Sequence, residues 1–434
     1  MKNFLTLLIA LIFYSSLANA QADTTLQNAD RFFNLFINGE PEAYSYFAKD
    51  FQDKVKPAQI ATIRQQFLAK FGKFISIEKV NKMTQQGTEF VLLNTSFEKA
   101  NPLFTMSLAK DGKLVGFFLA KENQKVTYKD PAYADKSLYE ERQLTVEVGE
   151  FKMPGILTTP NNVTNFPILV LVHGSGPGDK DLTIGGLKPF RDLALGLATK
   201  GIATLRYDKR TSIYRNPMAV GEDFTTKQET EDDALAAIKL ASNVDGVDKK
   251  QVYALGLSLG GMLMPRIAIS TNELAGVIIA AGPARSFQDI SIEQNTLSFN
   301  QKLIDQKTLD SAITLLNNTR FKTLGDKKPN TPTLYGPASY ILDLNNYNQT
   351  ETIKKFKGKI LVLQGEKDFQ VSMADFNLWK QALQKNKKAN AISFPSLGHP
   401  FVLAGKTNTI ADYDLPQNVP TEVIDAISNW ILNK

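Results

Sequence analysis

The chain has 434 residues, of which 43% are hydrophobic and 22% charged, as is usual for a globular protein large enough for more than one domain. It contains no cysteine, which excludes disulfides, cysteine nucleophiles and thiolate metal sites. The formal net charge is +6, but the lysines are spread along the chain, which argues against a nucleic-acid-binding protein.

The first twenty residues have the pattern of a secretory signal peptide. Lys2 precedes an apolar run over residues 4–17, and the Ala-Asn-Ala sequence at 18–20 fits a cleavage site. The run is short for a membrane helix, and no later segment is apolar over the length that a span needs. We therefore expect cleavage after Ala20 and a periplasmic or secreted product without a membrane span; the alternative is an uncleaved anchor.

Residues 21–125 predict a small α+β domain. Apolar residues fall at helical spacing between Ala29 and Phe36, and again between Ile60 and Phe71. Three strand-like segments follow, at residues 90–97, 104–109 and 114–119. The order of these elements resembles the cone-shaped fold of nuclear transport factor 2. Its aromatic residues are expected to form the core, although such a cone can also enclose a ligand.

Residues 126–140 are polar and predict a linker, and residues 141–434 predict a second domain. Two antiparallel strands at 144–148 and 155–158 open this domain. Further strands are expected at 168–172, 201–207, 252–257, 275–281, 359–363 and 391–394. Helices are expected at 190–199, 227–242, 259–270, 373–385 and 421–432. Alternation of this kind predicts a mostly parallel sheet with helices on both faces.

Residues 284–352 interrupt the alternation. Leu303, Leu309, Ile313 and Leu316 have near-helical spacing. From its position in the chain we expect this insertion to be a helical lid over the site. The alternative is a helical decoration without contact to substrate.

The nucleophile is expected at the end of strand 252–257. Residues 256–260 read Gly-Leu-Ser-Leu-Gly, a G-x-S-x-G pattern between a strand and a helix. A serine there sits in a tight, strained turn, and glycines are needed because flanking Cβ atoms would collide with the backbone. This pattern predicts Ser258 as the nucleophile.

The base and its orienting acid follow by position. Apart from His173, the chain offers only His399, which lies in a loop after a strand and before the final helix. Asp368 follows strand 359–363 and is the expected acid, with Glu366 as the alternative. The chain order Ser258, Asp368, His399 resembles the order characteristic of the α/β-hydrolase fold.

The oxyanion hole is expected to use two backbone N–H groups. One belongs to Leu259, directly after the nucleophile. The other comes from the loop that begins His173-Gly174-Ser175, with Ser175 the first choice and Gly174 the alternative. We expect His173 and Gly174 to support this loop.

These residues together resemble the α/β-hydrolase superfamily over roughly residues 140–434. Residues 173–179 (HGSGPGD) and 205–210 (LRYDKR) resemble bacterial exported hydrolases that carry an extra N-terminal α+β domain. The resemblance implies carboxylester hydrolysis, with serine-peptidase-like relatives nearby. Such relatives often have glycine after Asp-Lys-Arg, whereas Thr211 and Ser212 follow here.

Two further charged segments adjoin the expected site. Residues 206–210 lie at the carboxyl end of a strand, and we favour an ion-pair network that braces the oxyanion loop over a direct role in the pocket. Asp232 and Asp233 begin a predicted helix, where they are expected to act through the helix dipole or as a cap.

The sequence thus predicts a serine esterase that acts on a small-molecule ester through an acyl-enzyme. No cofactor or metal is implied, since neither a Walker A nor a dinucleotide-binding pattern occurs in a suitable context. An exported aminopeptidase or amidase with the same triad is one alternative. A non-enzymatic protein whose N-terminal domain binds a ligand is another. The sequence carries no signal for an oligomeric state.

Overall fold

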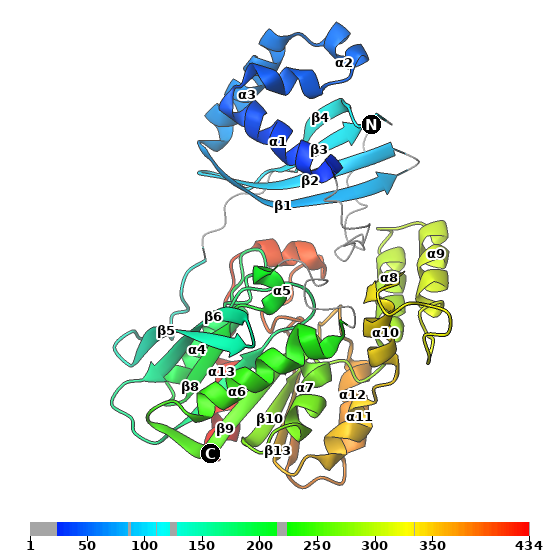
Figure 1. The fold of residues 1–434 in the computed structure, drawn as a ribbon. Coiled ribbons are helices and arrows are strands. Elements are labelled where there is room, and N and C mark those ends of the chain that lie inside the picture. Colours follow the sequence, from blue (N-terminus) through cyan, green and yellow to red (C-terminus); the bar gives the residue numbers. More distant parts are fainter. Residues whose placement is uncertain are drawn as a thin grey trace. The chain divides into compact units, whose positions relative to one another are not determined.

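The structure is a computed structural model and describes residues 24–85, 88–109, 111–121, 128–214, 224–333 and 335–433. The chain forms two compact units that meet in sequence at Thr127 and Tyr128 (Figure 1). The expected signal peptide, residues 1–20, lies outside the described residues. Within the described ranges, no helix has the length and apolar character of a membrane span.

The first unit places helices before an antiparallel sheet, which confirms the predicted α+β class. Its helical elements are α1 (Thr24–Asn38), η1 (Pro41–Tyr46), α2 (Lys49–Lys54) and α3 (Pro57–Phe71). Its strands are β1 (Phe74–Gln85), β2 (Thr88–Phe97), β3 (Leu103–Leu108) and β4 (Leu114–Lys121), paired in that order. The helices cover one face of the sheet (Figure 1).

Phenylalanine side chains fill the space between helices and sheet. Phe33 of α1 lies 5.2 Å from Phe104 of β3, and Phe36 lies 5.0 Å from Phe117 of β4, measured between ring centroids. The aromatics of this unit are therefore core residues, as expected.

Strand β1 was missing from the sequence prediction. It pairs with β2, but the register shifts twice, between Phe74 and Ser76 and between Ile77 and Lys79. Its core-facing residues Phe74, Ile77 and Val80 are consequently three apart instead of two. The bulges remove the two-residue period by which a strand is detected.

The second unit is built on an eight-stranded sheet. Its strands are β5 (Tyr139–Val148), β6 (Phe151–Pro160), β7 (Phe166–Val172), β8 (Ala203–Tyr207), β9 (Val247–Leu257), β10 (Leu274–Ala280), β13 (Lys359–Gly365) and β14 (Ala389–Phe394). The order across the sheet is β14-β13-β10-β9-β7-β8-β6-β5. β6 runs antiparallel to β5 and β8, and the remaining pairs are parallel. This is the predicted α/β-hydrolase sheet.

Helices cover both faces of this sheet. The helices are α4 (Pro189–Ala198), α6 (Asp232–Ser242), α7 (Leu259–Ile269), α12 (Met373–Leu383) and α13 (Thr421–Leu432). Side chains of α4 and α13 share one core cluster, and those of α6, α7 and α12 share the other. All seven residues of β7 are buried, with Leu169 in the first cluster and Val170 in the second. The expectation of a strand covered on both faces is confirmed.

The insertion between β10 and β13 is largely helical. It contains α8 (Phe287–Asn300), α9 (Gln306–Asn317), β11 (Pro332–Thr333), β12 (Gly336–Pro337), α10 (Ala338–Asn345), α11 (Gln349–Thr352) and η4 (Ile353–Lys355). Leu309 and Leu316 are buried side chains of α9, but Leu303 precedes the helix. The helical spacing that included Leu303 was therefore one turn too long, because Asp305 caps α9 at its start.

The predicted linker 126–140 is shorter than expected. From Tyr128 onward the chain packs on the second unit: Tyr128 donates its hydroxyl hydrogen to Asp192, and Tyr133 donates to the carbonyl of Val419 at 2.6 Å. β5 already begins at Tyr139. Polar composition suggested exposure, but tyrosines bury their rings while their hydroxyls find partners.

Candidate active site

Ser258 occupies a strained turn between β9 and α7. β9 ends at Leu257 and α7 begins at Leu259, so Ser258 alone connects them. Its φ is 56° and its ψ is −119°, a left-handed backbone conformation that non-glycine residues rarely adopt. The Ser258 N–H donates to the carbonyl of Ala280 on β10 at 2.9 Å, which holds the turn against the sheet. The predicted nucleophile thus sits in the geometry of a nucleophile elbow.

The loop after β7 packs directly against this turn. A Cβ on Gly260 would lie 2.6 Å from the carbonyl oxygen of His173, so a side chain there would separate the two segments. A Cβ on Gly174 would lie 3.1 Å from the Cβ and 3.7 Å from the Oγ of Ser258. The structure therefore brings the predicted oxyanion loop beside the predicted nucleophile.

His399 and Asp368 form a buried hydrogen-bonded pair. The His399 Nδ1 and the Asp368 Oδ2 are 2.7 Å apart. The other carboxylate oxygen, Oδ1, accepts from the N–H groups of Gln370 at 2.7 Å and Val371 at 2.9 Å, and Gln364 donates to Oδ2 at 3.0 Å. Because the carboxylate accepts bonds from these amides, the His399 Nδ1 carries the hydrogen, and Nε2 is left as a proton acceptor.

Close backbone packing joins the loops that carry these two residues. A Cβ on Gly365, at the end of β13, would lie 2.4 Å from the carbonyl oxygen of Leu397. The Lys367 N–H donates to the same carbonyl at 2.9 Å. Glu366, the alternative acid, is exposed and accepts a bond from Ser393. The acid loop is thus held so that Asp368, and not Glu366, meets His399.

The structure assembles the site as two halves. Ser258 lies with the oxyanion loop, and Asp368 lies with His399, at the carboxyl ends of neighbouring strands, where ligands bind in such sheets. Among the described residues, no hydrogen bond joins the Ser258 Oγ to His399. Such catalytic hydrogen bonds are often long in a free enzyme and tighten when substrate binds.

His173 is fixed within the oxyanion loop as a neutral side chain. Its Nε2 donates to the carbonyl of Asp179 at 2.8 Å, and its ring packs against Phe190 and Tyr207. Because a carbonyl only accepts, Nδ1 carries no hydrogen, and this atom is buried without a partner among the described residues. Burial lowers the pKa of His173 to about 4. The side chain can hold the loop but cannot gain a proton at neutral pH.

The oxyanion loop offers a free donor. None of the hydrogen bonds between described residues uses the backbone N–H of Ser175. Leu259 is the first residue of α7, so its N–H has no acceptor within the helix. Of the two residues predicted to supply the oxyanion hole, Leu259 therefore directly follows Ser258 in the chain, and Ser175 directly follows Gly174, which packs against Ser258.

Segment 206–210 forms the expected ion-pair network. Arg206 pairs with Glu141 and Asp181, and Arg210 pairs with Asp233. Lys209 contacts the oxyanion loop itself, since its Nζ donates to the carbonyl of Gly174 at 2.7 Å. This confirms the bracing interpretation. Thr211 and Ser212, which stand where relatives often have glycine, belong to the short helix α5 (Arg210–Ile213).

The role expected for Asp232 and Asp233 was wrong. The π-helical turn η3 (Lys227–Glu231) runs directly into α6, so neither residue lies at a free helix end. Asp233 pairs with Arg210, and Asp232 pairs with Lys227. The sequence pattern located the helix but not the extra turn before it.

Two partners of this network were missed by the sequence reasoning. Glu229 of η3 accepts from Lys209 and from the hydroxyl of Tyr340, the latter at 2.6 Å. Tyr340 belongs to α10 of the insertion, 111 residues further along the chain. No local signal in the sequence connects these residues.

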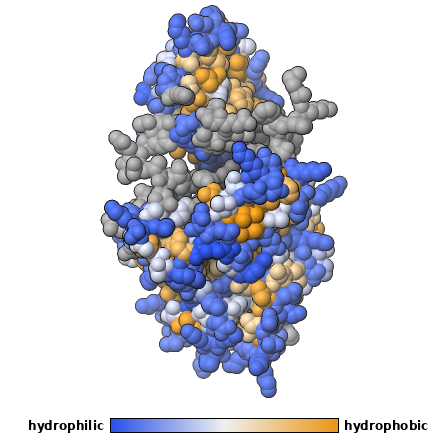
Figure 2. Space-filling view, turned by 90° about the vertical axis from the view of Figure 1, so that its right-hand side faces the viewer, coloured by the Kyte–Doolittle hydropathy of each residue, from blue (hydrophilic) through white to orange (hydrophobic). Residues whose placement is uncertain are grey.

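The insertion contacts the loops on both sides of Ser258. On the oxyanion side, Tyr340 binds Glu229, and on the acid side, Gln294 of α8 donates to the carbonyl of Gln370 at 2.8 Å. Phe287, Phe321 and Tyr335 of the insertion are only partly buried. Hydrophobic surface is visible on the face of the hydrolase unit that carries the insertion (Figure 2). These contacts suit a lid that offers apolar side chains to a substrate.

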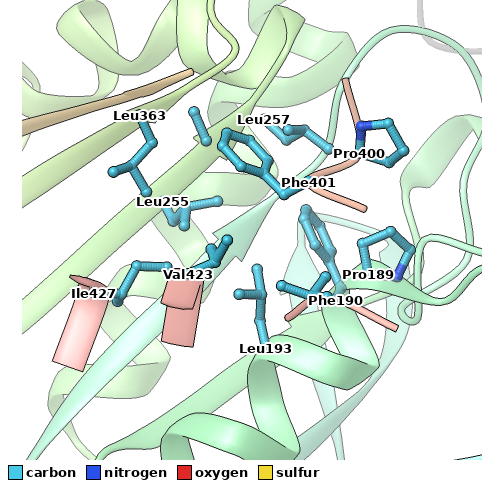
Figure 3. A pocket seen from close by; sticks show the side chains of 12 residues that line it. Pro189, Phe190, Leu193, Leu255, Leu257, Leu363, Pro400, Phe401, Val423 and Ile427 are labelled. Atoms are coloured by element: carbon cyan, nitrogen blue, oxygen red, sulfur yellow. The ribbon is translucent and has the colours of Figure 1, made fainter. Parts of the chain in front are cut away.

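An apolar cavity adjoins the turns that carry Ser258 and His399 (Figure 3). It is lined by Pro189, Phe190, Leu193, Leu255, Leu257, Ala280, Leu363, Pro400, Phe401, Val419, Val423 and Ile427. Leu257 directly precedes the nucleophile and Pro400 directly follows the histidine. The lining has no polar side chain to orient an ester, so this space belongs to the core between the sheet, α4 and α13. In the part of the chain that the structure describes, no cluster of three or more metal-binding side chains occurs.

The low pKa of His173 gives a pH-dependent stability. In the unfolded chain its pKa is about 6.5, so the unfolded state binds a proton more readily between pH 6.5 and 4, and stability is lost as pH falls through that window. We expect His173 to lower the free energy of unfolding by about 3 kcal/mol at pH 4 relative to neutral pH. Since the chain has two histidines, NMR of the ring Cε1–H groups resolves both, with His173→Gln for assignment. A His173 that titrates near 6.5 in the folded protein would contradict the burial argument.

The close backbone contact at Gly365 predicts that a side chain at this position lowers activity by displacing the loops that carry Asp368 and His399. Gly365→Ala should push the acid loop from the carbonyls of Leu397 and Gly398 and lower kcat/KM by about 10- to 100-fold, because the histidine is displaced. Gly398→Ala is the matched control: it is next to His399, but its added Cβ meets no atom closer than 4.0 Å. The measurement is the kcat/KM of ester hydrolysis for the two variants. Equal losses in both would contradict the role assigned to the close contact at Gly365.

Comparisons with known proteins assign both units. Residues 29–117 match the family described as "Protein of unknown function (DUF3887)", which corresponds to the first unit. Over 374 residues, the chain is 31% identical to esterase EstD of Thermotoga maritima, a match that covers 86% of this chain and 87% of the relative.

Solved structures match this chain at lower sequence identity. Est1E from Butyrivibrio proteoclasticus matches with a TM-score of 0.43 and 16% identity, over 67% of this chain and 98% of its own. A hyperthermophilic esterase from Pyrobaculum calidifontis matches with a TM-score of 0.40 and 14% identity, over 68% of this chain and 85% of its own. The extent and identity of the match to EstD, together with the sheet order, show that the chain belongs to the EstD family of α/β-hydrolase esterases.

Proposed function

We propose that Ser258, His399 and Asp368 form a catalytic triad that hydrolyses a carboxylester through an acyl-enzyme. The observation that carries the proposal is the buried hydrogen bond between the His399 Nδ1 and the Asp368 carboxylate. It orients an imidazole for proton transfer at the same sheet edge that carries Ser258 in its strained turn.

In the first half of the reaction, the Ser258 Oγ attacks the ester carbonyl while the His399 Nε2 takes its proton. The N–H groups of Leu259 and Ser175 stabilise the negative charge that develops on the carbonyl oxygen. His399 then protonates the leaving alcohol, which leaves an acyl group on Ser258. In the second half, His399 takes a proton from water as the water oxygen attacks the acyl carbon, and it then gives this proton to the Ser258 Oγ as the bond to the acyl group breaks and the acid departs. Asp368 stays ionised throughout and stabilises the imidazolium.

An ester is favoured over a peptide with a free amino end. An aminopeptidase needs an acidic group that is available to bind the amine. Glu229, the acid linked to the oxyanion loop, is already engaged by Lys209 and Tyr340. The apolar side chains of the insertion suit an acyl or alcohol group that is apolar.

We further propose that the protein is exported. The support is the sequence of residues 1–20, a basic start, an apolar run and a small-residue site. Expression of the full chain in a bacterium should yield a periplasmic or secreted protein whose first residue is Gln21. A mature protein that retains Met1 and remains with the membrane would support the anchor instead.

Active-site labelling tests the triad. A fluorophosphonate probe should modify Ser258, as mapped by mass spectrometry, and the adduct should disappear in Ser258→Ala and in His399→Ala. Asp368→Asn should lower kcat by about 10⁴-fold, because it favours the wrong histidine tautomer.

Glu366→Gln is the matched control, since it changes the exposed neighbouring acid and should leave kcat within about threefold. A panel of esters and aminoacyl amides, measured in parallel, separates esterase from amidase activity. Labelling of a different serine, or a folded wild type without an adduct, would refute the assignment.

A further inference from the structure

A buried lysine holds both ends of the oxyanion loop. The Lys209 Nζ donates to the carbonyl of Gly174 at 2.7 Å, and the Lys209 backbone N–H donates to the carbonyl of Gly178 at 2.9 Å. Only 2% of this residue is exposed. A desolvated ammonium is costly to bury unless its hydrogens are used, so its placement on this loop is a specific feature of the fold.

The carbonyl that Lys209 contacts belongs to the same peptide group as the Ser175 N–H. A peptide group is planar, and in its trans form the C=O and N–H point in opposite directions. The described residues contain no cis peptide bond. Fixing the Gly174 C=O toward Lys209 therefore fixes the Ser175 N–H in the opposite direction. A Cβ on Gly174 would lie 3.1 Å from the Ser258 Cβ, so the peptide group that Lys209 fixes begins at a residue packed against the proposed nucleophile.

Lys209 also changes the strength of that donor. A cation at the carbonyl oxygen draws electron density across the peptide group and leaves the amide hydrogen more positive. The effect is larger in a buried site, where water does not screen the charge, and linked hydrogen bonds polarise one another. A more positive N–H binds a developing oxyanion better than it binds a neutral carbonyl, which favours the transition state.

The position of Lys209 is set by a residue of the insertion. Oε1 of Glu229 accepts from the Lys209 Nζ, and Oε2 accepts from the Tyr340 hydroxyl at 2.6 Å. All three side chains are buried. The Tyr340 ring stacks on Phe224 at 6.0 Å with an interplanar angle of 12°, which fixes the direction of its hydroxyl. A continuous chain of hydrogen bonds thus runs from α10 to the oxyanion loop.

We infer that Lys209 is a positioning residue of the oxyanion hole, which orients and polarises the Gly174–Ser175 peptide, and that Tyr340 of the lid sets its position through Glu229. The inference rests on the proposed acyl transfer at Ser258. It assigns the insertion a part in charge stabilisation, in addition to covering the substrate.

A neighbouring residue provides a matched control. Arg210 is also a buried cation of this segment, 3% exposed and paired with Asp233, and it lies over the ring of Phe151. Its hydrogen bonds go to Asp233 and none reaches the oxyanion loop. Each substitution, Arg210→Met and Lys209→Met, removes a buried cation and leaves its carboxylate partner unpaired. Only Lys209→Met also removes a hydrogen bond to the Gly174 carbonyl.

The test compares binding of an oxyanion with binding of a neutral carbonyl. A trifluoromethyl ketone adds to the nucleophile and places an oxyanion in the hole, whereas the matching methyl ketone binds chiefly as a ketone. Lys209→Met should lower kcat by about 10- to 100-fold with KM within about threefold, because one oxyanion donor is weakened but not removed. The inhibition constant of the trifluoromethyl ketone should rise by the same factor, and that of the methyl ketone should stay unchanged. Arg210→Met, checked for folding by circular dichroism, should leave the ratio of the two constants unchanged.

Coupling to the lid is tested by a double variant. Tyr340→Phe should lower kcat by several-fold, and adding it to Lys209→Met should cause no further loss, because both act through one chain. Should Lys209→Met fail to fold, Tyr340→Phe with the same two ketones carries the test.

The outcomes separate the two proposals. Ester hydrolysis that survives in Ser258→Ala would overturn the triad and this inference with it. A wild type that depends on Ser258, beside a folded Lys209→Met variant with unchanged trifluoromethyl ketone affinity, would overturn the role of Lys209 and leave the triad standing.

Discussion

The buried parallel sheet of the second unit is the constraint on which the site depends. Its strands end at one edge, and backbone hydrogen bonds tie those ends together: the Ser258 N–H donates to Ala280, and the Ala281 N–H donates to Leu363. A serine with φ of 56° costs on the order of 1–3 kcal/mol. The sheet can hold this strain because strands such as β7 are buried on both faces, so the turn has no room to relax. The rigidity of the core is therefore what holds Ser258 in its strained turn.

The two histidines show how surroundings divide one residue type between two tasks. His173 is enclosed by Phe190 and Tyr207 and bonded to a backbone carbonyl, so desolvation keeps it neutral. His399 instead forms a 2.7 Å hydrogen bond from its Nδ1 to the Asp368 carboxylate, which fixes the orientation of its ring. The first is therefore a structural part of the loop, and the second is the residue to which we assign proton transfer.

Local patterns were sufficient for the parts of the site that a single segment defines. Ser258 lies in its strand–turn–helix context, and Asp368 and His399 follow strands in the required order, so each has a signal within about ten residues. Glu229 and Tyr340 have none, because they meet only after the insertion has folded. Strand β1 was hidden by its bulges, and the docked segment from Tyr128 by its polar composition. What the sequence missed was thus created by tertiary contacts or by irregular backbone.

The π-helical turn η3 has a consequence for how this site tolerates length changes. In η3 the N–H of Asp232 reaches back five residues to the carbonyl of Lys227, so the turn holds one residue more than an α-helix allows. Glu229 faces Lys209 on this turn, while Ala234 and Ile238 of α6 face the core. Deleting one residue would let an α-helical turn, with about 100° per residue, replace the wider π turn, so Glu229 and the core-facing side chains of α6 would keep nearly the same relative direction. The turn therefore absorbs its extra residue locally, and loss of that one residue should disturb the two faces of this segment less than a deletion in a regular α-helix would.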